Sequence, residues 1–434
     1  MTAPPPTDRA RKTSAGSRLF DRPLSRWWCV LGWLAATGVF VGLTQLLGGL
    51  SRGDAVESAY STWAVAHGSS CLYPTGVADG HPLIAPLYPL ISGALSWLAQ
   101  IGHGVAFPSQ SALGPHCSAT VTALSRWSSR AGALTSTVQL GYFAWVALMA
   151  GLIALLRASG RGRCGWEPAT LIIVACIPPV FMSVETSFHP EGLLAMGLVL
   201  GGLACARRGR WVWAGLLCGL AVTSQQFALL AVAPLLAVAP ASRRLRFAGA
   251  AVGAVAIVAV PLIALTSGRA LGGLTGSGLT LSTGDTLLSD LQLHGTALLV
   301  LSRLLPIVFA LALAWWAERR FGGIADDPVL LVSLVATSLG LRLVFEVNLF
   351  GYYFMAVALL LVTLDVIRRR FRPYLVMWLA LVTLVFPPLP LGNDVFTTGL
   401  PAWLWQVVLV GAALGLAASP LLSRPGAQPA STTG

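Results

Sequence analysis

Two acidic side chains stand three residues apart in the sequence Gly53-Asp54-Ala55-Val56-Glu57. A short helix at this point would place both carboxylates on one face, because residues three apart are neighbours on a helix surface. A carboxylate near an apolar boundary can accept the proton of an attacking hydroxyl group, since its surroundings tune its pKa. The sequence therefore predicts Asp54 as a general base with Glu57 beside it. The alternative is that both acids only solvate the start of a loop.

Two arginines lie inside apolar segments further along the chain. Arg303 stands in the segment 301–306, and Arg342 stands in the segment 341–346. An ionisable residue inside such a segment is energetically unfavourable and usually faces a partner or a cavity. The planar guanidinium group suits phosphate oxygens, which favours a phosphate-binding site. An internal ion pair between Arg342 and Glu346, one helical turn later, is the other interpretation.

A third group of polar residues marks the ends of apolar segments. His189-Pro190-Glu191 begins a predicted span, although proline in the first turn is also typical of an ordinary helix start. Two adjacent amides at positions 225 and 226 interrupt another apolar segment, where they would bind a sugar or lipid phosphate or satisfy exposed backbone. The candidate substrate-binding residues are therefore His189, Glu191, Gln225, Gln226 and Glu346. The histidines of the chain lack metal-ligand spacing, so no metal site is predicted.

The composition indicates what positions these residues. The chain has 434 residues, of which 56% are hydrophobic and 10% charged, and its mean hydropathy is +0.76. Soluble domains have a charged fraction near ~25%. Apolar runs of about 20 residues recur along the whole length, which is typical of membrane spans. Because backbone groups in lipid must be satisfied within each segment, and no alternating barrel pattern occurs, we expect an all-α polytopic membrane protein.

The net charge of +12 is distributed as the positive-inside rule predicts. Basic residues cluster in the N-terminal tail and at five later places, which we assign to the cytoplasmic side. This distribution gives no support to nucleic-acid binding. It places both termini in the cytoplasm and the acids described above at the outer side. The five later clusters are 157–163, 207–210, 243–246, 319–320 and 368–372.

The expected organisation is one transmembrane domain, 27–422, between a disordered cytoplasmic tail, 1–26, and a flexible cytoplasmic tail, 423–434. A long first extracytoplasmic loop, 51–129, follows the first helix, and its segment 83–101 is predicted to be a juxtamembrane helix. The segment 211–240 has basic clusters at both ends, so it is predicted to be a re-entrant hairpin or two short spans. The total is ten to twelve transmembrane helices. The other spans after the first are predicted at 131–156, 168–184, 190–206, 247–266, 295–316, 328–345, 350–367, 373–389 and 401–418.

Two of the seven cysteines, Cys71 and Cys117, fall in the predicted outer loop. An oxidising exterior would allow a disulfide between them that closes a long loop. Two free thiols are the alternative, because the sequence does not give their geometry.

Several short motifs follow one another along the chain. They are GDAVE at 53–57, HPLIAPLYP at 81–89, FHPEG at 188–192, TSQQ at 223–226 and FGYYF at 350–354. Together they resemble the multi-pass glycosyltransferases of the GT-C superfamily, which use polyprenyl-phosphate sugars, and in particular the bacterial mannosyl- and arabinosyltransferase branches. Many relatives have lysine where this chain has Gln225.

The resemblance implies an inverting transfer of a sugar from a polyprenyl-phosphate donor to a cell-envelope glycan or glycolipid, at the outer face of a bacterial cytoplasmic membrane. Asp54 would be the general base, and Arg303 and Arg342 would bind the donor phosphate. The resemblance requires no cofactor and leaves open whether a divalent cation assists. The low lysine content, with Lys12 alone, suggests a high-GC bacterium.

Two other classes of function fit a polytopic protein with buried arginines. A transporter or lipid flippase would need a comparable cavity, and it predicts internal repeats with paired broken helices, which the sequence lacks. A noncatalytic scaffold of an envelope-synthesis complex is the third alternative.

Overall fold

The computed structural model describes residues 20–47, 52–67, 86–100, 122–123, 126–127, 129–130, 133–184, 188–265, 297, 300–346, 351–385 and 402–423. These residues form helices and turns with no strand, which confirms the predicted all-α fold. Six of the described helices are long and apolar enough to cross a membrane, and seven apolar helices are shorter. The six are α2 (Arg26–Leu47), α6 (Ala133–Ala158), α9 (Pro190–Arg207), α12 (Ala241–Leu265), α16 (Leu305–Phe321) with the preceding π turn η4 (Val300–Leu304), and α20 (Ala402–Ser423).

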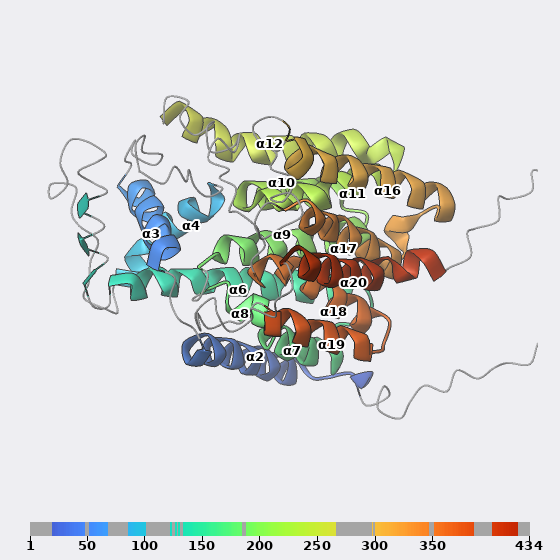
Figure 1. The fold of residues 1–434 in the computed structure, drawn as a ribbon, viewed down its shortest axis with the longest axis horizontal. Helices are drawn as coiled ribbons and strands as arrows, with labels where there is room; N and C mark the ends of the chain where they lie inside the picture. Colours follow the sequence, from blue (N-terminus) through green and yellow to red (C-terminus); the bar gives the residue numbers. More distant parts are fainter. Residues whose placement is uncertain are drawn as a thin grey trace, which may run out of the picture.

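The shorter elements fill the bundle between these helices. A predicted ten to twelve crossings requires some of these shorter helices to cross as well. Most of them lie along the same direction as the long helices (Figure 1). They are α7 (Trp166–Ala175), α8 (Pro178–Phe181), α10 (Trp211–Ser224), η3 (Gln226–Ala228), α11 (Leu229–Val238), η5 (Ile324–Asp326), α17 (Pro328–Val344), η6 (Gly351–Phe354), α18 (Met355–Ile367) and α19 (Pro373–Val385).

Two helices of the first loop, α3 (Arg52–Ala66) and α4 (Leu87–Gln100), lie together at one end of the bundle instead of running along it (Figure 1). The hydroxyl groups of Thr62 and Ser92 are 2.7 Å apart and join the two helices. The helix predicted within the segment 83–101 is therefore present as α4.

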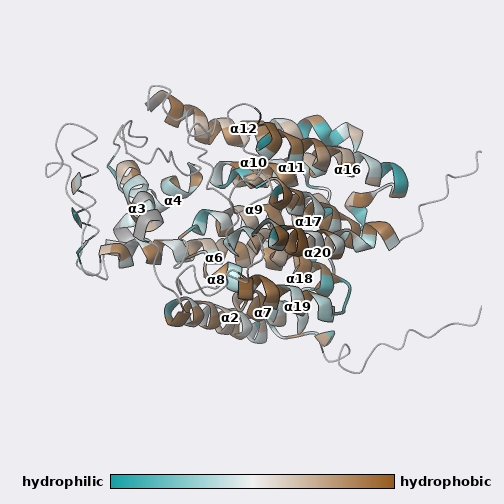
Figure 2. Ribbon diagram, viewed as in Figure 1, coloured by the Kyte–Doolittle hydropathy of each residue, from teal (hydrophilic) through white to brown (hydrophobic). Residues whose placement is uncertain are grey.

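The basic clusters meet at the other end, which we call the basic end. Arg369 pairs with Asp21 at 3.2 Å, and Arg208 donates a hydrogen bond to the backbone oxygen of Ala154. Arg243 donates to the backbone oxygen of Gly209 at 2.6 Å. Figure 2 shows hydrophobic residues along most of the helices and hydrophilic residues at the end of α16. The predicted grouping of the arginines at one side of the bundle is therefore present.

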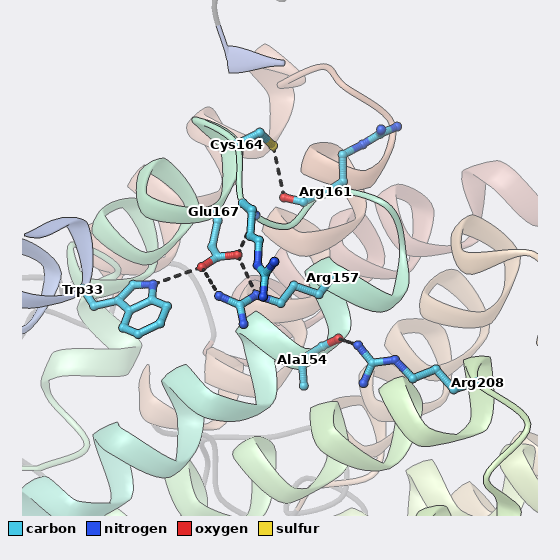
Figure 3. Close-up of polar contacts among 8 residues, drawn as sticks. Trp33, Ala154, Arg157, Arg161, Cys164, Glu167 and Arg208 are labelled. Carbon is cyan, nitrogen blue, oxygen red and sulfur yellow. Dashed lines mark hydrogen bonds and ion pairs between the residues drawn. The ribbon is translucent and has the colours of Figure 1, made fainter. Parts of the chain in front are cut away.

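Two buried carboxylates fix the helices at the basic end. Glu167 is fully buried and accepts hydrogen bonds from the Nε and Nη2 atoms of Arg157, both at 3.0 Å, from Trp33 Nε1 at 3.1 Å and from the backbone N–H of Arg163 at 2.9 Å (Figure 3). Asp365, also fully buried, accepts from Arg372 Nε at 2.6 Å and from its backbone N–H at 2.8 Å. Such bidentate, charge-assisted bonds are short and directional.

The segment between Arg207 and Arg243 turns back halfway, as predicted. The start of α10 and the start of α12 meet at the basic end through the bond from Arg243 to Gly209. At the turn, the Ser224 hydroxyl donates to the backbone oxygen of Glu191 at 2.8 Å. Gln225 has an extended backbone, with φ −156° and ψ 130°, and separates α10 from η3. The segment therefore contains two short helices joined at Gln225.

Glycine permits the closest packing in the bundle. A Cβ atom at Gly151 of α6 would collide with the backbone of Gly197 in α9, and a Cβ atom at Gly197 would collide with the backbone of Ala147. Small residues at such crossings let two helix backbones approach each other within a membrane. Helices α6 and α9 therefore form a tightly packed pair that runs from the basic end towards α4.

The helices differ from the predicted spans in several places. The span predicted at 168–184 is divided into α7 and α8, and the span predicted at 401–418 extends to Ser423. The span predicted at 247–266 begins at Ala241, so Arg243 and Arg244 lie in the first turn of α12. The span predicted at 295–316 extends to Phe321 and includes Arg319 and Arg320. Arginine has good helix propensity, and its long side chain reaches the membrane surface from inside a helix.

Candidate functional site

Glu191 lies in the first turn of α9, at the end of the bundle opposite to the basic end, and is 3% exposed. Its Oε1 atom is 2.8 Å from His189 Nδ1 and accepts a hydrogen bond from Gln225 Nε2 at 3.2 Å. Pro190 occupies the helix start, where a missing N–H has no consequence, and an acid in the first turn interacts favourably with the helix dipole. The structure thus brings together three predicted residues that are up to 36 positions apart in sequence.

A second carboxylate, Glu346, is shared by both arginines that the sequence places in apolar segments. Arg342 Nε donates to Glu346 Oε2 at 2.6 Å, and Arg303 Nη1 lies 3.8 Å from Glu346 Oε1. The predicted ion pair between Arg342 and Glu346 is therefore present. Two guanidinium groups against one carboxylate leave a net positive charge. The looser of them, Arg303, is carried by the π turn η4, and π turns occur frequently at functional sites.

Aromatic rings connect the two carboxylates. The Arg342 guanidinium carbon lies 4.7 Å from the ring centroid of Tyr353 and 5.3 Å from that of Phe227. Tyr353 packs edge to face against Tyr352 at 4.6 Å, and Tyr352 lies 4.3 Å from the ring of His189. Cation–π contacts hold an arginine without neutralising it. The polar residues of η4, α17, η6, α9 and the Gln225 turn therefore form one continuous cluster, the Glu191–Arg342 cluster.

The sequence profile of glycosyltransferase family 87 matches residues 114–345, just over half of the chain. The chain belongs to glycosyltransferase family 87. No curated protein and no solved structure matches the chain. Membership of family 87 is consistent with the resemblance to GT-C-type membrane glycosyltransferases and identifies the enzyme among the three functional alternatives.

The range matched by family 87 contains most of the cluster. His189, Glu191, Gln225, Arg303 and Arg342 lie within it. Tyr352, Tyr353, Glu346 and the helix α3 lie outside the matched range. Their assignment to the candidate site therefore depends on their positions in the structure.

Asp54 and Glu57 lie on α3, so the short helix predicted for them is present. Their side chains are outside the described part of the structure, as are Cys71 and Cys117. Ser58, one turn after Asp54, is 2% exposed and is close enough to Tyr88 of α4 to lower its pKa. Burial, and then the negative charge of Glu191, raise the pKa of Tyr88 well above its ordinary value. Tyr88 of α4 is therefore within electrostatic range of Glu191, and Ser58 of α3 lies beside Tyr88.

The remaining predicted residue, Gln226, begins the turn η3 and is exposed, unlike Gln225. In the described residues no group of three or more histidine, cysteine, aspartate or glutamate side chains is arranged to hold a metal ion. The five described cysteines form no disulfide.

The sequence alone does not identify the aromatic residues of this cluster. It offers Tyr352 and Tyr353 only as part of the FGYYF motif, and it assigns no function to Phe227 or Tyr88. One signal was present: tyrosines concentrated next to charged residues at the end of apolar segments mark a place where polar and apolar groups meet.

Proposed function

We propose that this family 87 glycosyltransferase transfers a sugar from a polyprenyl-phosphate donor to a hydroxyl group of an envelope glycan or glycolipid. The observation that carries this proposal is the pair of arginines around Glu346, which has an excess positive charge within a mostly apolar bundle. An anionic group attached to a lipid would satisfy that charge without leaving the membrane. The planar guanidinium fork matches the geometry of phosphate oxygens.

The chemistry follows from where charge develops. The acceptor hydroxyl attacks the anomeric carbon, the bond between that carbon and the phosphate oxygen breaks, and polyprenyl phosphate leaves with inversion. Arg303 and Arg342 would stabilise the charge that grows on the leaving phosphate. The proton of the hydroxyl would pass to Asp54, which stands three residues before Glu57 on the same helix.

The remaining cluster residues would bind the sugar. Glu191 holds His189 and Gln225, which offers a carboxylate, an imidazole and an amide to sugar hydroxyls. Tyr352 provides an aromatic surface beside them. By the positive-inside rule the basic end is cytoplasmic, so the proposed site faces the exterior and both termini are cytoplasmic.

The test is sugar transfer by the purified full-length protein in lipid nanodiscs, with polyprenyl-phosphate sugars and nucleotide sugars as competing donors. We expect transfer only from the polyprenyl donors. Asp54→Asn is expected to lower kcat by about 100-fold or more, which is the usual contribution of a general base. Glu57→Gln is the matched carboxylate-to-amide control and should have a smaller effect. Full activity of Asp54→Asn would show that Asp54 is not the general base. Transfer from nucleotide sugars would show that the donor is not restricted to polyprenyl-phosphate sugars.

A further inference from the structure

Three side chains near the end of α17 carry two positive charges and one negative charge. Arg342 Nε donates to Glu346 Oε2 at 2.6 Å, and Arg303 Nη1 lies 3.8 Å from Glu346 Oε1. Glu191, the other carboxylate of the cluster, has its own hydrogen-bond partners. Arg303, Arg342 and Glu346 therefore form a group with one net positive charge, which we call the Glu346 triad.

The structure holds the two arginines of the triad unequally. Arg342 has the short bond to Glu346, and its guanidinium carbon lies 4.7 Å from the ring centroid of Tyr353. Arg303 belongs to the π turn η4, and its contact with Glu346 is too long for a hydrogen bond. The side chain of Arg303 is 33% exposed, whereas that of Glu346 is 6% exposed. An incoming anion can therefore reach Arg303 and replace its loose contact while the pair of Arg342 and Glu346 stays intact.

The proposed reaction changes the charge of the phosphate. The donor is a phosphodiester, which carries one negative charge. The acceptor hydroxyl gives its proton to the base, the bond between the anomeric carbon and the phosphate oxygen breaks, and its electron pair stays on that oxygen. The leaving polyprenyl phosphate is a monoester, whose charge at neutral pH is roughly −1.5 to −2. The product is therefore attracted to positive groups more strongly than the donor is.

We propose that Glu346 sets the charge of the phosphate site, so that the site holds the donor and releases the product. The proposal rests on the proposed function, because it takes the donor phosphate to bind at Arg303 and Arg342. With the Glu346 carboxylate, the triad has one positive charge and matches the single charge of the donor. Without it, the two arginines would match the product instead. Glu346 acts through the arginines, so it is a positioning residue and its carboxylate regains Arg303 when polyprenyl phosphate leaves.

The kinetic test compares Glu346→Gln with wild type in phosphatidylcholine nanodiscs at neutral pH. Polyprenyl phosphate is added as a product inhibitor, and its Ki is compared with the donor KM. In Glu346→Gln the Ki should fall about tenfold or more, because the added net positive charge acts most strongly on the more highly charged product. The donor KM should fall less, and kcat should decline because product release becomes slow.

Binding without turnover is measured by the shift of the melting temperature with two probes, decyl phosphate, a monoester, and decyl methyl phosphate, a diester. Glu346→Gln should raise the ratio of the monoester shift to the diester shift. Arg303→Gln, which leaves the neutral pair of Arg342 and Glu346, should lower this ratio. A purely structural role of the triad would instead weaken the response to both probes in both variants.

Two controls separate the position of the charge from the loss of a charge. Glu318→Gln removes the same charge at the basic end, where Glu318 accepts hydrogen bonds from the backbone N–H groups of Gly323 and Ile324. Glu346→Asp keeps the charge at the triad on a shorter side chain. Both variants should keep the wild-type ratio of Ki to donor KM.

The outcomes distinguish this proposal from the proposed function. Equal ratios of Ki to donor KM in wild type and Glu346→Gln would overturn the role of Glu346, as would equal ratios of the two melting shifts. If Glu346→Gln does not fold, Arg303→Gln decides, since an unchanged melting ratio in that variant also overturns the role. The expected melting ratios, in a protein that transfers nothing from polyprenyl donors, would support the role of Glu346 and overturn the proposed function alone.

Discussion

At the basic end, Glu167 accepts four hydrogen bonds from two arginines and a tryptophan, whereas at the opposite end Glu346 has one close arginine contact at 2.6 Å and one loose contact at 3.8 Å. Both carboxylates are buried. The first is saturated with donors that come from α2, α6 and the chain before α7, so it joins helices (Figure 3). The carboxylate of Glu346 is shared by Arg303 and Arg342, so the three side chains together carry a net positive charge.

The same contrast separates Asp365 from Glu191. Asp365 is paired with Arg372, which is held in turn by the backbone oxygen of Leu416 at 2.8 Å. Glu191 has an imidazole and an amide as partners, and neither carries a permanent charge. A carboxylate whose hydrogen bonds are all made to charged donors stabilises one arrangement of the helices. A carboxylate with fewer or neutral donors can exchange one of them for a ligand. We therefore propose that the basic end mainly stabilises the fold and that the opposite end carries the reaction.

Glu167→Ala should have the largest effect on folding. The change removes four hydrogen bonds to a buried carboxylate and leaves Arg157, whose side chain is 32% exposed, without this partner. The free energy of unfolding should fall by roughly 3 kcal/mol, about the value of two hydrogen bonds to a charged group. Thermal or denaturant unfolding in detergent measures this loss. Activity per folded molecule should stay near wild type, and a selective loss of turnover with normal stability would contradict the division between the two ends.

Asp365→Asn should have the next largest effect. The amide keeps the size of the side chain but weakens the charge-assisted bonds to Arg372, each of which is worth about 1.5–3 kcal/mol. The unfolding free energy is expected to fall by about that amount. Ser419→Ala, which removes only a 3.1 Å contact to Arg372, is the milder control. Equal destabilisation by the two variants would argue against a central role for Asp365.

Arg342→Lys tests the end opposite to the basic end. The charge is retained, but the planar fork is lost, so sugar transfer should fall at least about tenfold, or about 1.4 kcal/mol in the activation barrier. The melting temperature should change less than in Asp365→Asn. Arg320→Lys at the basic end is the matched control. If Arg342→Lys destabilises the fold and leaves the rate per folded molecule unchanged, Arg342 stabilises the fold and has no direct part in the reaction.

Gln225→Ala should have the smallest effect of the four. It removes one hydrogen bond of 3.2 Å to Glu191, worth about 1 kcal/mol, so activity should decline about fivefold. Gln226→Ala changes the exposed neighbour and should have no effect. Kinetics at saturating donor measure both, and a larger loss at position 226 would reverse the roles assigned to the two amides.

The sequence predicted the fold class, the clustering of arginines and the turn at Gln225 because each depends on a local pattern of charge or hydropathy. Arg303 and Arg342 are candidates from sequence because charged residues are conspicuous in apolar segments, and the structure places both beside Glu346. The positions of α12 and α16 were less predictable, because arginines continue a helix while their side chains reach polar surroundings.

The way the site is assembled was not predictable from local patterns. Glu191 and Arg342 are linked through the rings of His189, Tyr352 and Tyr353, and this linkage depends on the packing of α9 against the chain after α17.

The length of α10 fixes how deep the proposed reaction occurs. Its 14 residues rise about 21 Å from the basic end, which is short of the roughly 30 Å of a hydrocarbon core. Because Ser224 donates a hydrogen bond to Glu191 at that height, the proposed orientation would place the cluster beneath the outer headgroup layer. A lipid-borne sugar reaches this depth by lateral diffusion and a slight descent, while a water-borne sugar would have to shed its hydration shell first. The half-length hairpin would thus select the carrier before any contact with the sugar itself.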